Sequence, residues 1–297
     1  MQPVADAPIV RRLAYRPPLD FDALIAFFAA RAVPGVEEVA CGRYRRSLRL
    51  AHGPGVVELE AGAGRVVAGF WLADGRDIAG AVQRVRALLD LDSDPEPIAR
   101  TLSLDHVLEP LARRSPGRRV PGSADGDELA VRAVLGQQVS LSAAAALAGR
   151  LVAAYGEPLV RPLGNVTHVF PAAAALARAD PARLAMPAAR ARALLALAAA
   201  LTGGELVLDA RADRHEARRR LLALPGIGPW TSEYVAMRAL RDPDAFPVRD
   251  LGLRRALERL GYDGRPASAA RIAERWRPYR AYALMHLWSL LADREPV

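Results

Sequence analysis

The sequence contains no lysine, so all 41 residues in its Lys+Arg total are arginines. A guanidinium offers phosphate a planar fork of donors, but it does not form the Schiff base that a lysine amine forms with a carbonyl. The sequence also has a single cysteine, Cys41. One thiol cannot make an internal disulfide, a structural zinc site or an iron–sulfur cluster, each of which needs several ligands. We expect Cys41 to be a small apolar strand residue.

Long hydrophobic runs are also missing. The longest, such as residues 193–201, fall short of the ~20 residues that span a bilayer, and residues 1–12 lack the basic-then-apolar pattern of a signal peptide. With 297 residues and 52% apolar side chains, the chain can still bury the cores of two or three domains. We therefore expect a soluble, cytoplasmic protein with no membrane partner.

Acidic residues are fewer than basic ones. The chain has 33 acidic residues against 41 arginines, which gives a net charge of +8. This balance suits a polyanionic partner such as nucleic acid, although many basic proteins bind none. A GC-rich genome that favours Arg, Ala, Gly and Pro codons is an alternative origin of the arginine bias.

Residues 1–95 predict a small α+β domain built on an antiparallel sheet. The apolar pattern predicts strands at 36–50, 56–60 and 65–72, and helices at 20–31 and 77–89. An acidic, proline-containing linker follows at 92–97. Nearly all of residues 96–297 then has helical spacing, with predicted helices at 127–135, 140–155, 171–178, 181–185, 188–201, 215–224, 230–240, 251–260, 267–276 and 279–291. Many short helices with brief connections predict a compact all-α body.

Residues 224–240, LPGIGPWTSEYVAMRAL, break one helix and start another at once. Glycine allows positive φ, whereas proline forbids helix continuation. The turn leaves unpaired N–H groups at the start of the second helix, where the helix dipole favours an anion. The turn by itself is either an ordinary helix–helix connection or a cradle for one phosphate.

The whole stretch LPGIGPWTSEYVAM resembles the helix-hairpin-helix element of the DNA glycosylase superfamily, in which an LPGxG hairpin grips a DNA phosphate and an aspartate follows at a fixed distance. Asp250, in AFPVRDLGLRRAL, matches that aspartate, twenty positions after Trp230. The segments SPGRRVPG, DELAVRAVLGQQVS, FPVRDLGL and RPYRAYALMHLW resemble the alkylbase branch, DNA-3-methyladenine glycosylase II. The resemblance covers essentially the whole chain, with its specific motifs in the C-terminal half.

This resemblance implies an α+β N-terminal domain, residues 1–95, followed by a helical glycosylase region, residues 96–297, with two subdomains. One is 126–242, with the hairpin at 215–240, and the other joins 96–125 to 243–297. The implied activity is hydrolytic excision of alkylated bases, such as 3-methyladenine, from double-stranded DNA in base excision repair, which leaves an abasic site. Such an enzyme flips its target base out of the duplex. We expect a monomer without a cofactor.

Asp250 is the expected catalytic residue. Breaking an N-glycosidic bond builds positive charge on the sugar, which a nearby carboxylate stabilises while it directs water. The alternative is that Asp250 only caps the helix at 251–260, and capping is compatible with catalysis. Asp242, Asp244 and Glu233 lie nearby in the sequence but do not hold the motif position, and only the resemblance excludes Glu233.

Trp230, Tyr234 and Trp288 match family positions that line the base pocket. Trp230 and Tyr234 are four residues apart and so share a helix face. Such a pair is often plain core packing, but electron-rich rings also attract a cationic alkylated purine by about 0.5–2 kcal/mol. Tyr282 and His286, again four apart, are expected to orient this wall.

For DNA binding, the resemblance implies the backbone N–H groups of Gly226 and Gly228, together with Thr231, at the phosphate, and Gln138 as the wedge that fills the gap in the duplex. An amide at the wedge departs from family members that are apolar there. The family's monovalent cation would be held by the backbone carbonyls of three hairpin residues, Leu222, Leu224 and Ile227.

Related enzymes that nick the strand use a lysine at the position of Trp230, so the absence of lysine argues against lyase activity. Repair by methyl transfer would need a reactive cysteine, and Cys41 lies in no recognisable nucleophile motif. Two rivals remain open. One is a DNA-binding protein that keeps the hairpin without catalysis, and the other is a glycosylase for another lesion, such as hypoxanthine or an etheno adduct.

Overall fold

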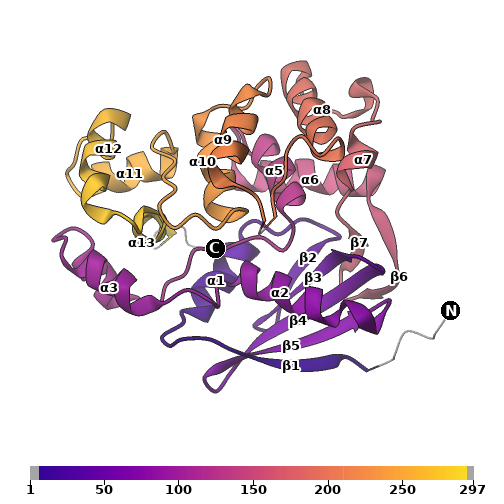
Figure 1. Cartoon of the computed structure of the whole chain (residues 1–297), viewed down its shortest axis with the longest axis horizontal. Helices are drawn as coiled ribbons and strands as arrows, with labels where there is room; N and C mark the ends of the chain where they lie inside the picture. Colours follow the sequence, from indigo (N-terminus) through magenta and orange to yellow (C-terminus); the bar gives the residue numbers. More distant parts are fainter. Residues whose placement is uncertain (1–6, 210, 293–297) are drawn as a thin grey trace.

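The computed structural model describes residues 7–209 and 211–292. Its first part is an antiparallel five-stranded sheet in the order β1-β5-β4-β3-β2, with β1 Ile9–Ala14, β2 Glu37–Ala40, β3 Arg43–Leu50, β4 Gly53–Gly62 and β5 Arg65–Leu72. Figure 1 shows this sheet at the bottom of the molecule, with helices α5–α10 above it and α11 and α12 to the left. The predicted α+β N-terminal domain is confirmed, and β1 is a strand that the sequence pattern did not indicate.

Two helices, α1 Phe21–Ala29 and α2 Ile78–Leu88, cover one face of the sheet. In β5 the side chains alternate between buried and partly buried, and Val66, Ala68 and Phe70 point into the shared core. This alternation is what period-two patterning predicts for a sheet with one covered face. Asp20 caps α1 by accepting the N–H of Ala23 at 3.1 Å.

The predicted strand at 36–50 is two strands, β2 and β3, joined by a turn at Cys41 and Gly42. Both turn residues have positive φ, 52° and 72°. Cys41 is exposed in this turn, so the prediction that it is a small apolar strand residue is wrong. A two-residue hairpin needs this left-handed backbone, and glycine supplies only one of the two positions.

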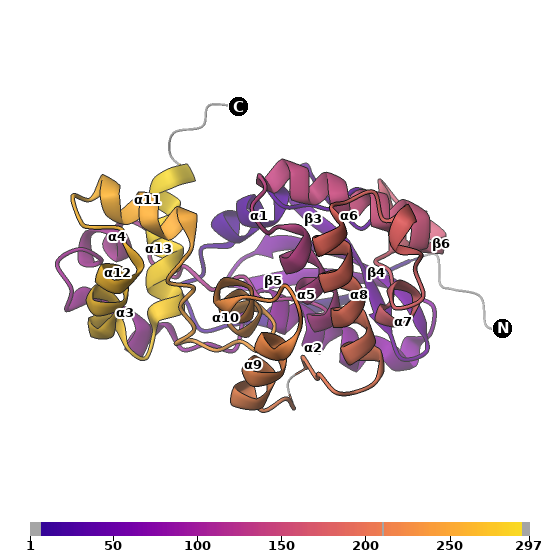
Figure 2. The same cartoon turned by 90° about the horizontal axis from the view of Figure 1, so that it is seen from above.

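The second part is mainly helical. Its helices are α3 Pro95–Ser103, α4 Glu109–Arg114, α5 Gly126–Leu135, α6 Leu141–Tyr155, α7 Ala173–Leu176, α8 Ala188–Thr202, α9 Arg214–Ala223, α10 Pro229–Arg238, α11 Leu251–Arg259, α12 Pro266–Ala273 and α13 Arg280–Ala292, with short 3-10 turns at Pro181–Arg183 and Glu274–Trp276. A further 3-10 turn, Gly75–Asp77, precedes α2 in the first part. Figure 2 shows α3, α4 and α11–α13 gathered at one end of the molecule. No helix in the described ranges is long and apolar enough to span a membrane.

A β-hairpin interrupts the helical part. Its strands are β6 Glu157–Leu163 and β7 Val166–Val169, and Leu159, Val166 and Val169 pack against Val56 of β4. The N–H groups of Thr167 and His168 also donate to the carbonyl of Gly35, at 2.8 and 2.9 Å. The hairpin therefore joins the helical part to the sheet, a contact that helical spacing along the sequence did not predict.

The basic segment at 115–122 is an internal strap. Arg119 is 2% exposed and donates to the backbone carbonyls of Ser93, Arg16 and Pro18. Gly117 has φ +77°, and a Cβ there would lie 2.5 Å from the carbonyl carbon of Pro18. Arg119 therefore fastens this segment to residues of the N-terminal part of the chain. The domain boundaries at 95, 125 and 242 stay predictions.

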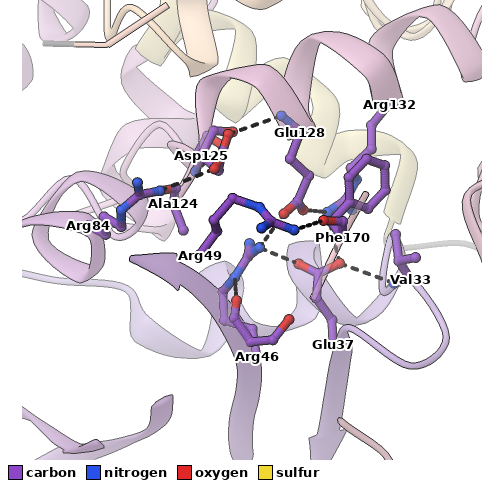
Figure 3. Close-up of polar contacts among 12 residues, drawn as sticks. Val33, Glu37, Arg46, Arg49, Arg84, Ala124, Asp125, Glu128, Arg132 and Phe170 are labelled. Atoms are coloured by element: carbon purple, nitrogen blue, oxygen red, sulfur yellow. Dashed lines mark hydrogen bonds and ion pairs between the residues drawn. The ribbon is translucent and has the colours of Figure 1, made fainter. Parts of the chain in front are cut away.

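A buried charge cluster joins the sheet to α5 (Figure 3). Glu37 of β2 and Arg46 of β3 face Glu128 and Arg132 of α5, with Arg46 to Glu128 at 2.6 Å and Arg132 to Glu37 at 2.9 Å. Burial alone would raise the pKa of Glu37, but the charges of Arg132 and Arg46 outweigh it and lower that pKa. Each charge has partners of the opposite sign, which buried ions require.

Candidate active site

Asp250 is the N-cap of α11. Its Oδ1 accepts the N–H of Leu253 at 2.8 Å, and its own N–H donates to Pro247 at 2.8 Å. Asp is a favoured capping residue because its side-chain oxygen satisfies an N–H of the first helical turn. The capping role weighed in the sequence analysis is therefore confirmed, and it holds the carboxylate in one orientation.

Two indoles also bind this carboxylate. Trp288 of α13 donates Nε1–H to Oδ1 at 2.9 Å, and Trp230 of α10 donates Nε1–H to Oδ2 at 2.8 Å. Within the described ranges, Asp250 forms no ion pair. Its three donors are neutral, so they orient the carboxylate without cancelling its charge. The arrangement can stabilise positive charge that develops on a bound molecule.

The other nearby carboxylates are neutralised by arginines. Glu233 accepts from Arg218 at 2.8 Å, and Asp242 accepts from the same guanidinium at 2.6 Å. Asp244 is paired with Arg280 at 2.8 Å and also with Arg277. This pairing gives a physical reason, beyond the resemblance, for setting these three aside.

Trp230 and Tyr234 stack on each other on α10. Their ring centroids are 5.3 Å apart, with an interplanar angle of 16°. Both side chains are half-buried, so the pair packs internally and also keeps exposed surface. Trp288 is half-buried as well, and its indole binds the other oxygen of the Asp250 carboxylate, Oδ1. The role of these three rings as a base pocket stays a prediction.

Phe27 of α1 and Arg31, two residues beyond the end of that helix, are further residues near the site that the sequence did not indicate. Phe27 stacks on Trp288 with centroids 6.3 Å apart at 17°, and the guanidinium carbon of Arg31 lies 3.7 Å from the Phe27 centroid. The predicted helix at 20–31 gave a weak indication of this pair, because Phe27 and Arg31 are four residues apart and would share one face of that helix. Which protein surface that face meets could not be read from α1 alone.

Two guanidiniums surround the hydroxyl of Tyr234. Arg238 donates to it at 2.8 Å, and Arg31 lies close by. Burial lowers the pKa of Arg31 to about 10. Burial would raise the pKa of Tyr234, but the positive charges of Arg238 and Arg31 outweigh it and lower that pKa. This end of the site is therefore positively charged.

The predicted helical hairpin is confirmed as α9, a turn at 224–228, and α10. Gly226 has φ +76°, and a Cβ there would lie 2.8 Å from the Cβ of Ala193 in α8, so glycine is needed for both conformation and space. Gly228 is the N-cap of α10 and has no side-chain cap, and Pro229 follows as the first helical residue. The N–H groups at this helix start are thus not bound by a capping side chain.

The loop between α5 and α6 reaches the hairpin. Gln137 donates Nε2–H to the carbonyl of Gly226 at 3.0 Å and to the hydroxyl of Thr231 at 2.9 Å. Thr231 is buried, so its side chain is turned toward Gln137 rather than outward. Gln138 is exposed, and its φ of +55° is a backbone conformation that costs free energy in a residue other than glycine. The DNA roles of Gln138, Gly226, Gly228 and Thr231 stay predictions.

Leu222, Leu224 and Ile227 all belong to the hairpin. The carbonyl of Leu224 accepts the N–H of Ile227 at 3.2 Å, and each carbonyl oxygen has two lone pairs. Oxygen ligands suit a hard cation, so the donor type fits the monovalent cation that the resemblance implies. These three residues stay predicted ligands.

Tyr282 and His286 are both buried on α13. Tyr282 donates its hydroxyl to Asp90 at 2.7 Å and so fastens α13 to the segment after α2. His286 is buried, and burial with the nearby Arg118 charge lowers its pKa to about 4. The role of these two residues in orienting the aromatic wall at Asp250 stays a prediction.

Two family models match the chain. Residues 10–125 match the AlkA N-terminal domain, and residues 131–280 match the HhH-GPD superfamily base excision DNA repair protein. A Mycobacterium tuberculosis protein named probable bifunctional transcriptional activator/DNA repair enzyme AlkA is 50% identical over 94% of this chain and 56% of its own length. The Escherichia coli DNA-3-methyladenine glycosylase 2 is 36% identical over 93% of this chain and 95% of its own.

A solved structure of 3-methyladenine DNA-glycosylase from Archaeoglobus fulgidus is similar in fold, with a TM-score of 0.82 and 24% identity over 97% of this chain and 100% of that one. The chain spans about half the length of the M. tuberculosis relative. The first family match extends to residue 125, beyond the predicted boundary at 95.

Proposed function

The chain belongs to the HhH-GPD superfamily of base excision DNA repair proteins, and we propose that it is a monofunctional DNA glycosylase that excises alkylated bases from double-stranded DNA. The observation that carries this proposal is the Asp250 carboxylate, which is held by two indoles and a backbone N–H and has no ion-pair partner among the residues that the structure describes. A protein that only grips phosphate needs no such group.

In the proposed reaction, backbone N–H groups at Gly226 and Gly228 hold a phosphate beside the flipped nucleotide. Gln138 enters the gap in the duplex, and Trp230, Tyr234 and Trp288 contact the base. As the N-glycosidic bond breaks, its electron pair leaves with the base, and Asp250 stabilises the positive sugar. Water then bonds to the sugar carbon and loses a proton to Asp250 or solvent, which leaves an abasic site.

The sequence has no lysine, so we propose no Schiff-base lyase step through a lysine. We also propose that the protein acts as a monomer in the cytoplasm and needs no cofactor for the chemistry. A monovalent cation held by the carbonyls of Leu222, Leu224 and Ile227 would neutralise part of the phosphate charge at the hairpin. We therefore expect DNA binding to weaken when potassium is replaced by a large organic cation at equal ionic strength.

The test compares wild type with Asp250→Asn on methylated duplex DNA, with released bases separated by chromatography. Asn also caps helices well, so the variant should fold. Asp213→Asn is the matched control, since Asp213 caps α9 through the N–H groups of His215 and Glu216, away from Asp250. We expect release to fall only in Asp250→Asn. Equal release by all three proteins would contradict the catalytic assignment, and tight binding without release by any would favour a pure binding protein.

A second candidate, excision of neutral lesions such as hypoxanthine, is favoured by one observation. The ring face of Phe27 is already occupied by Arg31, and Arg238 lies 4.8 Å from Phe27 and 5.5 Å from Tyr234. These charges oppose a cationic base, and like charges a few ångströms apart cost about as much as the 0.5–2 kcal/mol that a cation gains from a ring. Release from duplexes that carry one 3-methyladenine or one hypoxanthine decides between the two.

A further inference from the structure

Gly252 lies in the first turn of α11, directly beside the Asp250 carboxylate. Glycine disfavours helices compared with alanine, and the backbone here has no positive φ that would require it. The local helix therefore gives no reason for a glycine at this position.

The surroundings do give a reason. A Cβ at position 252 would lie 3.0 Å from Oδ1 of Asp250, 3.0 Å from Nε1 of Trp288 and 3.1 Å from Cδ1 of Trp288. The first two atoms are the acceptor and the donor of the 2.9 Å hydrogen bond between the indole and the carboxylate. A methyl group would thus press on both ends of that bond.

Neither partner is free to move away. Asp250 is held through Oδ2 by Trp230 and through Oδ1 by the N–H of Leu253. Trp288 is stacked on Phe27. An added methyl must therefore displace the carboxylate or the indole by a few tenths of an ångström. By contrast, Gly80, in the first turn of α2, has no atom within 4 Å of an added Cβ.

We propose that Gly252 is a positioning residue, whose missing side chain lets Trp288 and Asp250 form the hydrogen bond that sets the carboxylate for base excision. The proposal rests on the glycosylase function proposed above. It predicts that alanine at 252 harms the chemical step and leaves DNA binding intact, because the atoms nearest an added methyl belong to Asp250 and Trp288 rather than to the hairpin turn or the wedge loop.

The experiment measures Gly252→Ala against wild type and Gly80→Ala. Single-turnover release of methylated bases is followed with enzyme in excess, and affinity is measured on duplex DNA that contains an abasic-site analogue. We expect release by Gly252→Ala to fall about tenfold or more, since a 1 Å misplacement costs about 100-fold, with unchanged affinity. Gly80→Ala should match wild type in both.

A spectroscopic readout tests the contact itself. The chain has four tryptophans, so four indole N–H signals are expected in nitrogen-15 spectra. In Gly252→Ala the Trp288 signal should shift, while that of Trp71 on β5 should not. Unchanged release by Gly252→Ala overturns the proposal, as does a loss of both binding and thermal stability that Gly80→Ala does not share. If wild type releases no base, the proposed function fails, whereas the Trp288 shift still tests the contact.

Discussion

Replacing Trp288 with phenylalanine removes one hydrogen bond to Asp250 and keeps an aromatic ring against Phe27. The indole Nε1 lies 2.9 Å from Oδ1, and the ring stacks on Phe27 at 6.3 Å. Oδ1 keeps the N–H of Leu253, and Oδ2 keeps the indole of Trp230. The variant therefore loosens the carboxylate from one side without leaving either oxygen unbonded.

The size of the effect follows from the charge on the acceptor. A hydrogen bond to a charged group contributes about 1.5–3 kcal/mol, and about 1.4 kcal/mol corresponds to tenfold in rate. If the bond serves the transition state in full, Trp288→Phe lowers release by about 10- to 150-fold. The two remaining donors limit the loss, so we expect the lower half of that range.

The assay is single-turnover release of methylated bases at saturating enzyme. Trp71→Phe is the control, since Trp71 is a half-buried residue of β5 in the sheet. Wild-type release by Trp288→Phe would refute the reasoning that the indole positions the carboxylate. An equal loss in Trp71→Phe would refute it too, because the effect would then come from tryptophan replacement in general.

Three further outcomes are expected. Arg132→Met leaves Glu37 and Glu128 buried with one fewer partner, so urea unfolding should show a loss of about 3–5 kcal/mol, against about 1 kcal/mol or less for Arg45→Met, whose ion pairs are partly exposed. His286 has its pKa lowered to about 4 in the folded chain against about 6.5 when unfolded, so stability should fall as pH drops from 7 to 4, and His286→Gln should reduce this fall. Affinity for duplex DNA should decrease with salt at a log–log slope of about −0.9 per phosphate neutralised, and a flat dependence would contradict a DNA partner.

Much of the fold could be predicted from the sequence, because residue type and short-range apolar patterns decide most of its helices and strands. In the strand at 65–72, side chains that point into the core alternate strictly with side chains that do not. The turn of the helical hairpin consists largely of prolines and glycines, which disfavour a helix interior. The hairpin β6–β7 was not predicted, since Pro158, Pro162 and Gly164 read as a connection between helices. Its strands are held by the sheet and by Gly35, more than 120 residues earlier in the chain.

Asp250 shows how far the sequence reaches into the site. Its capping role depends on residues within three positions, and its distance from Trp230 marks it by resemblance. The sequence did not indicate that Trp230 and Trp288 would bind opposite oxygens of one carboxylate. It also left Phe27 and Arg31 as ordinary residues of a helix in another part of the chain.

The sequence by itself determined most of the helices, the helical hairpin, the capped aspartate and the absence of lysine chemistry, because each depends on residue type or on neighbours within a few positions. Only the tertiary structure decided which side chains meet. An apolar pattern identifies the face of a helix that is buried, but not the surface that buries it. The contacts among Phe27, Trp288 and Asp250, and the crowding at Gly252, exist because α1, α11 and α13 pack together.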